Sequence, residues 1–460
     1  MAEAPKRTAR EDMTRETSEP LLPPAHRRFK PYPSYKDSGV EWLGEIPAHW
    51  EVTPLKHVAN FINGFAFKPD EWGLEGIPII RIENLNGGEN FNCTTRTLPA
   101  KYCAAKGDLL FGWSGNRGTS FGPFLWSRDG THYVNQHIFR VVDFASDKTW
   151  MYWALRGVTF YVEKQAHGII GMVHVTRGEV GTIPIPVLPH QEQEQIAEFL
   201  EREHARIDGL VAKKERLIEL LQEKRAALIT RAVTKGLDPT IPMKDSGVEW
   251  LGQIPMHWQV KRTKFAARLR SGHTPSRQHP EYWQDCTIPW FGLADVWQIR
   301  DGQTETVTET SEKISELGLA NSAARLLPRG TVMLSRTASV GFSSIMGVDM
   351  ATTQDFVNWV CGASLRPEYL LYVFRSMQHE FQGLTMGSTH QTIYMPDVGR
   401  FSTPMPPIDE QDRIVQVVRA GTREIDALVA KVREAIGRLQ ELRIALISAA
   451  VTGKIDVRAA

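Results

Sequence analysis

The chain has 460 residues, 42% of them hydrophobic and 23% charged, and its formal net charge is +1. This length exceeds what a single hydrophobic core usually serves, so we expect at least two domains. The near-neutral charge disfavours a purely electrostatic, sequence-blind polyanion binder, and no stretch approaches the roughly 18 consecutive apolar residues of a membrane span.

Neither the N-terminus nor the cysteines indicate export or metal binding. Residues 1–30 are predicted to be a flexible tail, because they are rich in charge, Pro and Thr and lack the apolar core of a signal peptide. Cys93, Cys103, Cys286 and Cys361 form no C-x-x-C pair and have no histidine at metal-ligand spacing. Isolated thiols are typical of a reducing compartment, so we expect a cytoplasmic protein without a metal site.

One segment of the chain is written twice. Residues 36–52 read KDSGVEWLGEIPAHWEV, residues 244–260 read KDSGVEWLGQIPMHWQV, and 14 of the 17 positions are identical. Tryptophan and proline recur at fixed spacing in both copies, which is typical of a packed, irregular segment. We therefore expect either a docking segment at the start of each half of the chain or a structural plug beneath each domain.

A variable globule follows each copy of this segment, and the two predicted domains cover residues 31–190 and 236–408. Short β-rich runs alternate with Gly and Asn turns in both, for example Asp108–Phe111 in the first and Phe356–Val360 in the second. This pattern predicts two mixed α/β globules whose sequences are similar at only a few scattered positions.

A long helix is predicted to close each half, over residues 191–235 and 409–454, with a short tail at 455–460. Both stretches contain few helix breakers, their apolar residues recur at alternating steps of three and four, and Glu192 and Glu410 suit a first turn. Six apolar stripe positions carry the same residue in both copies, as expected of two helices that share one seam. The stripes consist of Ile207, Val211, Ile218, Leu221, Leu228 and Ala232 in the first helix and of Ile425, Val429, Ile436, Leu439, Leu446 and Ala450 in the second.

Two similar helices would hold the two different globules at a fixed separation. Such a separation is useful when the ligand is long and has a regular repeat. The 27 residues from Ile207 to Val233 would form about 40 Å of helix at about 1.5 Å per residue. One turn of B-DNA is about 34–36 Å, the separation at which two modules enter successive major grooves. Many coiled-coil spacers have this length, so a tether that binds no DNA is the alternative.

Both globules contain the residue types that contact phosphates and base edges, since Arg pairs with guanine and Gln or Asn with adenine. The DNA-binding candidates of the first globule are Arg81, Asn84, Trp113, Asn116, Arg117, His137, His167, His174 and Arg177. Those of the second globule are Arg270, His273, Thr274, Ser276, Arg277, Arg336, Gln354, His390 and Gln391.

Motifs of catalysis are missing from the sequence. It contains no N-P-P-[FYW] of an amino-methyltransferase, no G-x-x-x-x-G-K-[ST] phosphate loop and no D/E-x-K triplet of a restriction nuclease. The sequence also shows no recognisable pairing of a nucleophile with a general base, so we expect the isolated chain to have no catalytic site. A single-chain DNA methylase or nuclease with built-in recognition is the enzymatic alternative.

The arrangement resembles the specificity subunit of Type I restriction–modification systems over nearly the whole chain after about Tyr32. The likeness rests on the doubled KDSGVEWLG segment, the IPxPPxxEQ-type entry to each helix and the ID.LVAK…L…R.ALI..AVT helices. SGHTPSRQHPEYW, followed by IPW at Ile288, resembles the opening of many target-recognition domains, whereas NGFAFKPDEW after Ile62 departs from that opening.

The resemblance implies an α+β fold of two mixed α/β target-recognition domains, separated by two long conserved helices that pair as an antiparallel coiled coil with an internal pseudo-twofold repeat. Each domain would read one half of a bipartite double-stranded DNA site. The helices would set the gap and dock two copies of a methyltransferase (modification) subunit, and motor-nuclease (restriction) subunits would join them. S-adenosylmethionine, ATP and Mg²⁺ would bind to those partners, and this chain would bind no cofactor.

Overall fold

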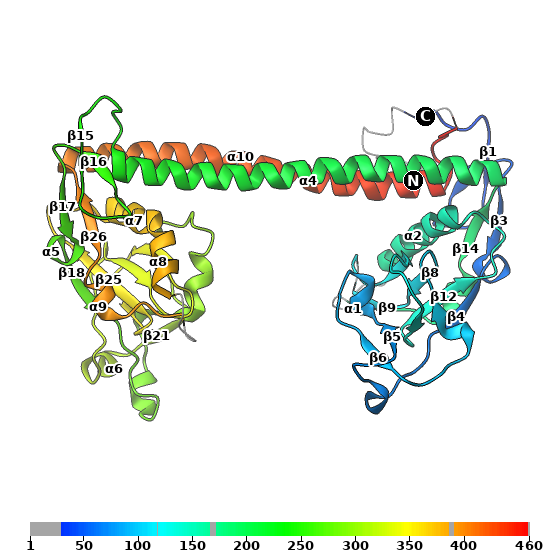
Figure 1. Cartoon of the computed structure of the whole chain (residues 1–460), viewed down its shortest axis with the longest axis horizontal. Helices are drawn as coiled ribbons and strands as arrows, with labels where there is room; N and C mark the ends of the chain where they lie inside the picture. The colour runs from blue at the N-terminus through cyan, green and yellow to red at the C-terminus, as the bar shows by residue number, and fades with distance from the viewer. Residues whose placement is uncertain (1–28, 117, 166–171, 386–390, 459–460) are drawn as a thin grey trace, which may run out of the picture. The chain divides into compact units, whose positions relative to one another are not determined.

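A computed structural model describes residues 29–116, 118–165, 172–385 and 391–458, and these form two compact units (Figure 1). Unit 1 is the chain up to Lys213 together with the stretch from Ala435 onward, and unit 2 is Lys214–Glu434. Each unit combines one globule with parts of the two longest helices, α4 (His190–Lys235) and α10 (Ile408–Val451). The mixed α/β class and the long helices expected from the sequence are confirmed.

The globule of unit 1 is built from two four-stranded sheets with strand orders β10-β8-β12-β4 and β6-β5-β11-β7. Its helices are α1 (Ile82–Leu85), α2 (Lys148–Gln165) and α3 (Arg177–Thr182). Its strands are β1 (Tyr35–Asp37), β2 (Glu45–Pro47), β3 (Glu51–Pro54), β4 (Asn60–Asn63), β5 (Ile77–Ile80), β6 (Asn92–Thr94), β7 (Cys103–Ala104), β8 (Leu109–Gly112), β9 (Ser114–Asn116), β10 (Gly122–Leu125), β11 (His132–Val134), β12 (Ile138–Val142), β13 (Met172–His174) and β14 (Pro184–Val187).

Helix α2 is apolar on two faces because it lies between two layers. Met151 and Leu155 pack into the core of the sheet that contains β8 and β12. Trp150 and Trp153 pack into a second core with Phe199 of α4 and residues near the end of α10. The long helices of unit 1 are therefore fixed to the globule through α2.

The globule of unit 2 has a five-stranded sheet of order β18-β25-β22-β23-β20 and a three-stranded sheet of order β21-β19-β24. Its helices are α5 (Thr263–Ala266), α6 (Glu316–Ala320), α7 (Pro367–Ser376), α8 (Gln378–Thr385), α9 (Met395–Val398) and the 3₁₀ helix η6 (Leu293–Gln298). Its strands are β15 (Met243–Asp245), β16 (Gln253–Pro255), β17 (Gln259–Arg262), β18 (Ala267–Ser271), β19 (Ile288–Phe291), β20 (Thr306–Val307), β21 (Glu312–Ile314), β22 (Val332–Ser335), β23 (Ser343–Met346), β24 (Ala351–Thr352), β25 (Phe356–Cys361) and β26 (Ser402–Met405).

Helix α7 takes the place in unit 2 that α2 takes in unit 1. All six residues from Tyr369 to Phe374 are buried, and the rings of Trp359 and Phe374 lie 4.6 Å apart. The Tyr369 hydroxyl lies 3.1 Å from the Pro404 carbonyl and 3.3 Å from the Val233 carbonyl of α4. Helix α7 therefore joins the sheet to the long helices of its unit (Figure 1).

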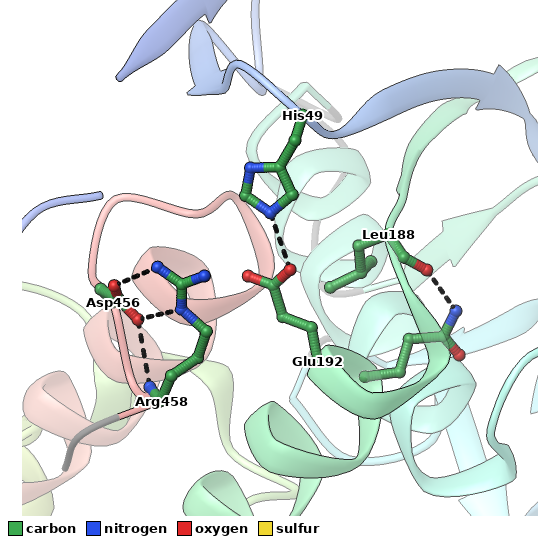
Figure 2. Close-up of polar contacts among 6 residues, drawn as sticks. His49, Leu188, Glu192, Asp456 and Arg458 are labelled. Carbon is green, nitrogen blue, oxygen red and sulfur yellow. Dashed lines mark hydrogen bonds and ion pairs between the residues drawn. The ribbon is translucent and has the colours of Figure 1, made fainter. Parts of the chain in front are cut away.

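The doubled segment makes the same contacts in both units. Each copy forms a two-stranded hairpin, β1–β2 or β15–β16, followed by a fully buried tryptophan, Trp50 or Trp258. Next to that tryptophan, His49 Nε2 lies 2.8 Å from Glu192 Oε2 at the start of α4 (Figure 2). His257 lies at the same distance from Glu410 at the start of α10. The buried rings fit the interpretation of the segment as a structural plug.

The hairpin of each copy also caps the end of a long helix. The Lys454 ammonium group, just after α10, donates to the Glu45 carbonyl in unit 1. The Lys235 ammonium group, at the end of α4, donates to the Gln253 carbonyl in unit 2. The sequence repeat is therefore also a repeat of contacts, because one helix begins and the other ends at each hairpin.

The two long helices touch each other within each unit. In unit 1, Ile207 and Val211 of α4 share a core with Leu439 and Leu446 of α10. In unit 2, Arg225 Nε of α4 lies 3.0 Å from Asp426 Oδ1 of α10. All twelve predicted stripe residues are buried or half-buried.

Two glycines, Gly453 and Gly39, differ in how closely the first hairpin packs against them, and substituting each one tests that packing. Gly453 and Gly39 both have left-handed φ, +69° and +71°, but an added Cβ would lie 2.3 Å from Pro47 Cδ at Gly453 and meet nothing within 4 Å at Gly39. We expect Gly39→Ala to cost about 1 kcal/mol of unfolding free energy and Gly453→Ala about 3 kcal/mol, because only the second adds a clash. Urea denaturation measures both, and equal losses would contradict this packing.

His204 of α4 should make unit 1 sensitive to acid. Burial, and then the guanidinium groups of Arg443 and Arg156, lower the pKa of His204 from 6.5 to about 4. The unfolded chain then takes up this proton first, so the stability present above pH 6.5 is lost as the pH falls toward 4. Because His204 is only half-buried and solvent screens part of this effect, we expect a loss of about 1 kcal/mol between pH 7 and pH 5. Comparing urea midpoints of the wild type and His204→Gln at both pH values tests this, and an unchanged pH dependence in the variant would refute it.

Candidate nucleic-acid interface

Several loops of unit 2 leave the sheets at one edge. Strand β18 leads into His273, whose amide donates to the Thr352 carbonyl over 3.0 Å, and the Thr353 amide donates to the Phe291 carbonyl at the end of β19 over 3.0 Å. A Cβ added to Gly272 would lie 2.1 Å from the Thr353 carbonyl oxygen, so the backbones meet here only because residue 272 is glycine. The loops after β18, β19 and β24 therefore begin side by side.

Four predicted contact residues meet at this edge. The Thr274 hydroxyl lies 2.6 Å from Gln354 Oε1, and Arg336 Nε lies 2.9 Å from the Gln354 carbonyl. Arg336 Nη1 also lies 3.3 Å from the Ile393 carbonyl, and the Gln391 carbonyl accepts the Ala338 amide over 2.9 Å. We call this group, Thr274, Arg336, Gln354 and Gln391, the unit 2 edge cluster.

The remaining candidates of unit 2 lie around or away from this cluster. His273 and Ser276 are exposed on the loop after β18. Arg277 lies 3.6 Å from the centre of the Trp283 ring and pairs with Glu312 at 2.6 Å. Arg270 instead lines a separate cavity of about 400 Å³ that two further arginines, Arg268 and Arg325, also line. His390 lies outside the described residues.

Unit 1 brings three of its candidates together at the corresponding place, next to Gln136. The Trp113 indole nitrogen donates to the Gln136 carbonyl over 2.8 Å, and the Trp113 ring lies 5.5 Å from the His137 ring and 4.7 Å from the His174 ring. Gln136 follows β11 as Gln354 follows β24. We call Trp113, His137 and His174, with Gln136, the unit 1 edge cluster.

Other candidates of unit 1 are held by the protein itself. Arg81 Nη1 lies 2.6 Å from Asn92 Oδ1 and 3.1 Å from Glu83 Oε1. Asn84 is buried, and its amide nitrogen donates to carbonyls within its own loop, so it closes that loop and does not face solvent.

Three more candidates of unit 1 remain. Asn116 pairs with Met172 in the β9–β13 ladder. Arg177 lines a cavity of about 440 Å³ with Lys56 and Asp143, at the end of β12 remote from His137. Arg117 and His167 lie outside the described residues.

The edge clusters consist of guanidinium, imidazole, amide, hydroxyl and indole groups, which are hydrogen-bonding and stacking groups. Among the residues that the structure describes, no group of three or more His, Cys, Asp or Glu could hold a metal ion. Within the same residues, no helix is both long and apolar enough to cross a bilayer.

A family model described as the Type I restriction modification DNA specificity domain matches residues 47–220 and 255–437. These two stretches make up more than half of the chain, and each contains most of one globule and part of one long helix. The chain belongs to this family.

Two relatives are Type I specificity subunits, one similar over most of the chain and the other over about a third of it. The EcoBI specificity subunit of Escherichia coli is 23% identical over 441 residues, 92% of this chain and 90% of that protein. The MjaIX specificity subunit of Methanocaldococcus jannaschii is 28% identical over 170 residues, 36% of this chain and 38% of that protein.

Two solved structures are similar in fold. A chain from a structure of type I R-M complex assembly and conformational transition has a TM-score of 0.64 at 16% identity and covers 88% of this chain and 98% of its own. The HsdS subunit of Thermoanaerobacter tengcongensis has a TM-score of 0.50 at 16% identity and covers 89% and 98%. At these identities the likeness is one of fold.

The sequence analysis did not single out one exposed aromatic residue near the unit 2 edge cluster. Trp297 of η6 is 70% exposed, and Arg300 of the same loop lies 3.2 Å from the Ser339 hydroxyl, next to the edge cluster. A tryptophan in the largely apolar stretch LADVWQI is typical of a core position, so the sequence offers no signal for its exposure.

Proposed function

We propose that this chain is the specificity subunit of a Type I restriction–modification complex and that each unit reads one half of a bipartite double-stranded DNA site. The observation that carries this proposal is the pair of edge clusters. They occupy the same position in two similar globules and differ in their side chains, as two readers of different half-sites would. The members of both clusters are suited to base and phosphate contacts.

The long helices would connect the readers and dock the partners. The contacts within each unit place the later part of one helix against the earlier part of the other, which supports an antiparallel coiled coil with a pseudo-twofold repeat. Equivalent hairpin and helix surfaces in both units would dock two copies of a methyltransferase subunit, and motor-nuclease subunits would join that assembly. The domain boundaries at residues 190, 235 and 408 are part of this proposal.

Chemistry would belong to the partners, and this chain would be a non-catalytic subunit of the cytoplasmic complex. We expect S-adenosylmethionine, ATP and Mg²⁺ to bind to the partner subunits, since the sequence contains no motif for any of them. The predicted stripe residues would form the seam of the helix pair, and the exposed faces of α4 and α10 would contact the partners.

Exchanging one globule tests this division of labour. Replacing residues 53–183 with the corresponding globule of another family member should change one half of the methylated DNA sequence and leave the other half as it was. The measurement is a map of methylated adenines in cells that carry the complete system. A changed second half-site would contradict independent reading.

The two alternatives predict other results. A tether without DNA recognition predicts that the chain, purified with its methyltransferase subunit, shows no preference among duplexes in competition binding. A single-chain enzyme predicts methyl transfer from labelled S-adenosylmethionine by the purified chain alone.

A further inference from the structure

In the short helix η6 of unit 2 a carboxylate is buried and an indole is exposed. Asp295 is 1% exposed, whereas Trp297 is 70% exposed and Leu293 38%. The Trp297 indole has no hydrogen bond, ring contact or cation–π contact with any residue that the structure describes. Burying a carboxylate and exposing an indole both cost free energy, so this arrangement needs a reason outside the stability of the fold.

Several hydrogen bonds hold η6 in this orientation. Asp295 Oδ2 accepts the Gly292 amide over 3.0 Å, and its Oδ1 accepts the Ser311 amide and the Ser311 hydroxyl, each over 2.6 Å. Val296 and, just after η6, Ile299 are buried as well. Because the buried side of η6 is fixed in this way, Trp297 stays exposed, as does Arg300 in the loop that follows, whereas the one carboxylate of η6, Asp295, is buried.

Both ends of η6 lie beside the unit 2 edge cluster. The helix follows Gly292, where an added Cβ would lie 3.2 Å from the Thr353 side chain, one residue before Gln354. At the other end of η6, Arg300 Nη2 lies 3.2 Å from Ser339 Oγ, in the loop that follows Arg336. The indole therefore adds an apolar surface to an edge that otherwise offers hydrogen-bonding groups.

The loop after η6 is clamped to three helices of the same unit. Arg225 of α4 donates to the Gly302 carbonyl over 2.8 Å, and Arg375 of α7 donates to the Thr304 carbonyl over 2.7 Å. Arg419 of α10 lies 2.8 Å from Glu305 Oε2, which leaves the carboxylate paired. A loop held in this way loses little conformational entropy when a ligand binds.

From this arrangement we propose that Trp297 is a DNA-contacting residue whose indole packs against a base step of the half-site read by unit 2, with Arg300 on the adjacent phosphate. This inference rests on the proposed function. A duplex fits the face because it offers both flat apolar base surfaces and phosphates, and aromatic side chains both stack on bases and wedge between base steps. Burial of Asp295 removes the one carboxylate of η6 from the surface that a polyanion would approach, and the exposed Asp301 next to Arg300 accepts hydrogen bonds from the Gln303 and Thr304 amides.

The test uses the chain in complex with its methyltransferase subunits. The probe is the duplex that the wild-type complex enriches from a randomised pool, and competition binding gives the affinity. We expect Trp297→Ala to weaken binding about 10-fold and Trp297→Phe, which keeps an aromatic face, to weaken it less than about 3-fold. Phe265→Ala is the matched control, because Phe265 is 76% exposed on α5, at the opposite end of β18, and should bind as the wild type does.

Each outcome separates the inference from the proposed function. If the wild-type complex enriches no duplex, the proposed function fails and takes the inference with it. If it enriches one and Trp297→Ala binds that duplex as tightly as the wild type does, the inference alone is overturned. Loss of the methyltransferase subunit from Trp297→Ala in size-exclusion chromatography would instead make Trp297 a protein contact and overturn the inference.

Discussion

Replacing Arg336 with alanine should weaken discrimination at one half-site about 100-fold and leave the other half-site unaffected. The Arg336 guanidinium donates to the carbonyls of Gln354 and Ile393, so one side chain holds loops from three parts of unit 2 together. Without it, two carbonyls lose their donor and the edge cluster loses its geometry, which affects more than one base contact. Competition binding with duplexes altered in either half-site measures the effect.

Two variants make this result specific. Arg336→Lys should fail to restore discrimination, because an ammonium group keeps the charge but lacks the planar fork that reaches two carbonyls. Arg329→Ala removes an exposed arginine at the opposite end of β22 and should leave discrimination unchanged. Restoration by lysine would show that charge alone matters at position 336 and would contradict the role in loop geometry.

Replacing Trp258 with alanine should lower the unfolding free energy of unit 2 by about 3–5 kcal/mol, the range measured for buried aromatic residues. The side chain is fully buried in a core with Ile229 and Val233 of α4, next to the hairpin that caps that helix. Trp50→Ala should have the same effect on unit 1, so each variant is the control for the other. Hydrogen exchange, resolved by segment, shows which unit opens.

A milder substitution separates packing from hydrogen bonding in this core. The indole nitrogens of Trp50 and Trp258 have no hydrogen-bond partner among the residues that the structure describes. Trp258→Phe should therefore cost only about 1–2 kcal/mol, because it removes ring volume and no hydrogen bond. A loss as large as that of alanine, or one spread equally over both units, would contradict the packing described here.

Much of the helical and repeated structure was predictable because its causes are local in sequence. Glu192 and Glu410 stand in the first turns of α4 and α10, where the sequence pattern places helix starts. The doubled hairpin was visible as two nearly identical stretches. Its pairing with Glu192 and Lys454 was not, because those partners are 143 and 409 residues away from it in the chain.

The candidate interface was only partly predictable. Residue type alone picked out Arg336, Gln354 and Trp113, which the structure brings to the edges. The same reasoning also picked out Asn84, which closes its own loop, and Arg177, which lines a separate cavity. Residue type cannot distinguish these cases, because an amide or guanidinium group serves equally well as an internal donor and as a contact to a ligand.

The sequence by itself determined the order of globule and helix, its doubling, and the apolar stripes of the helices, since periodicity and repetition are carried by neighbouring residues. Only the tertiary structure decided which side chains share an edge and which way η6 faces. Those depend on parallel and antiparallel strand pairings over long sequence separations, and on Asp295 finding its donors inside the globule. This is why Trp297 reads as a core residue in the sequence and is exposed in the fold.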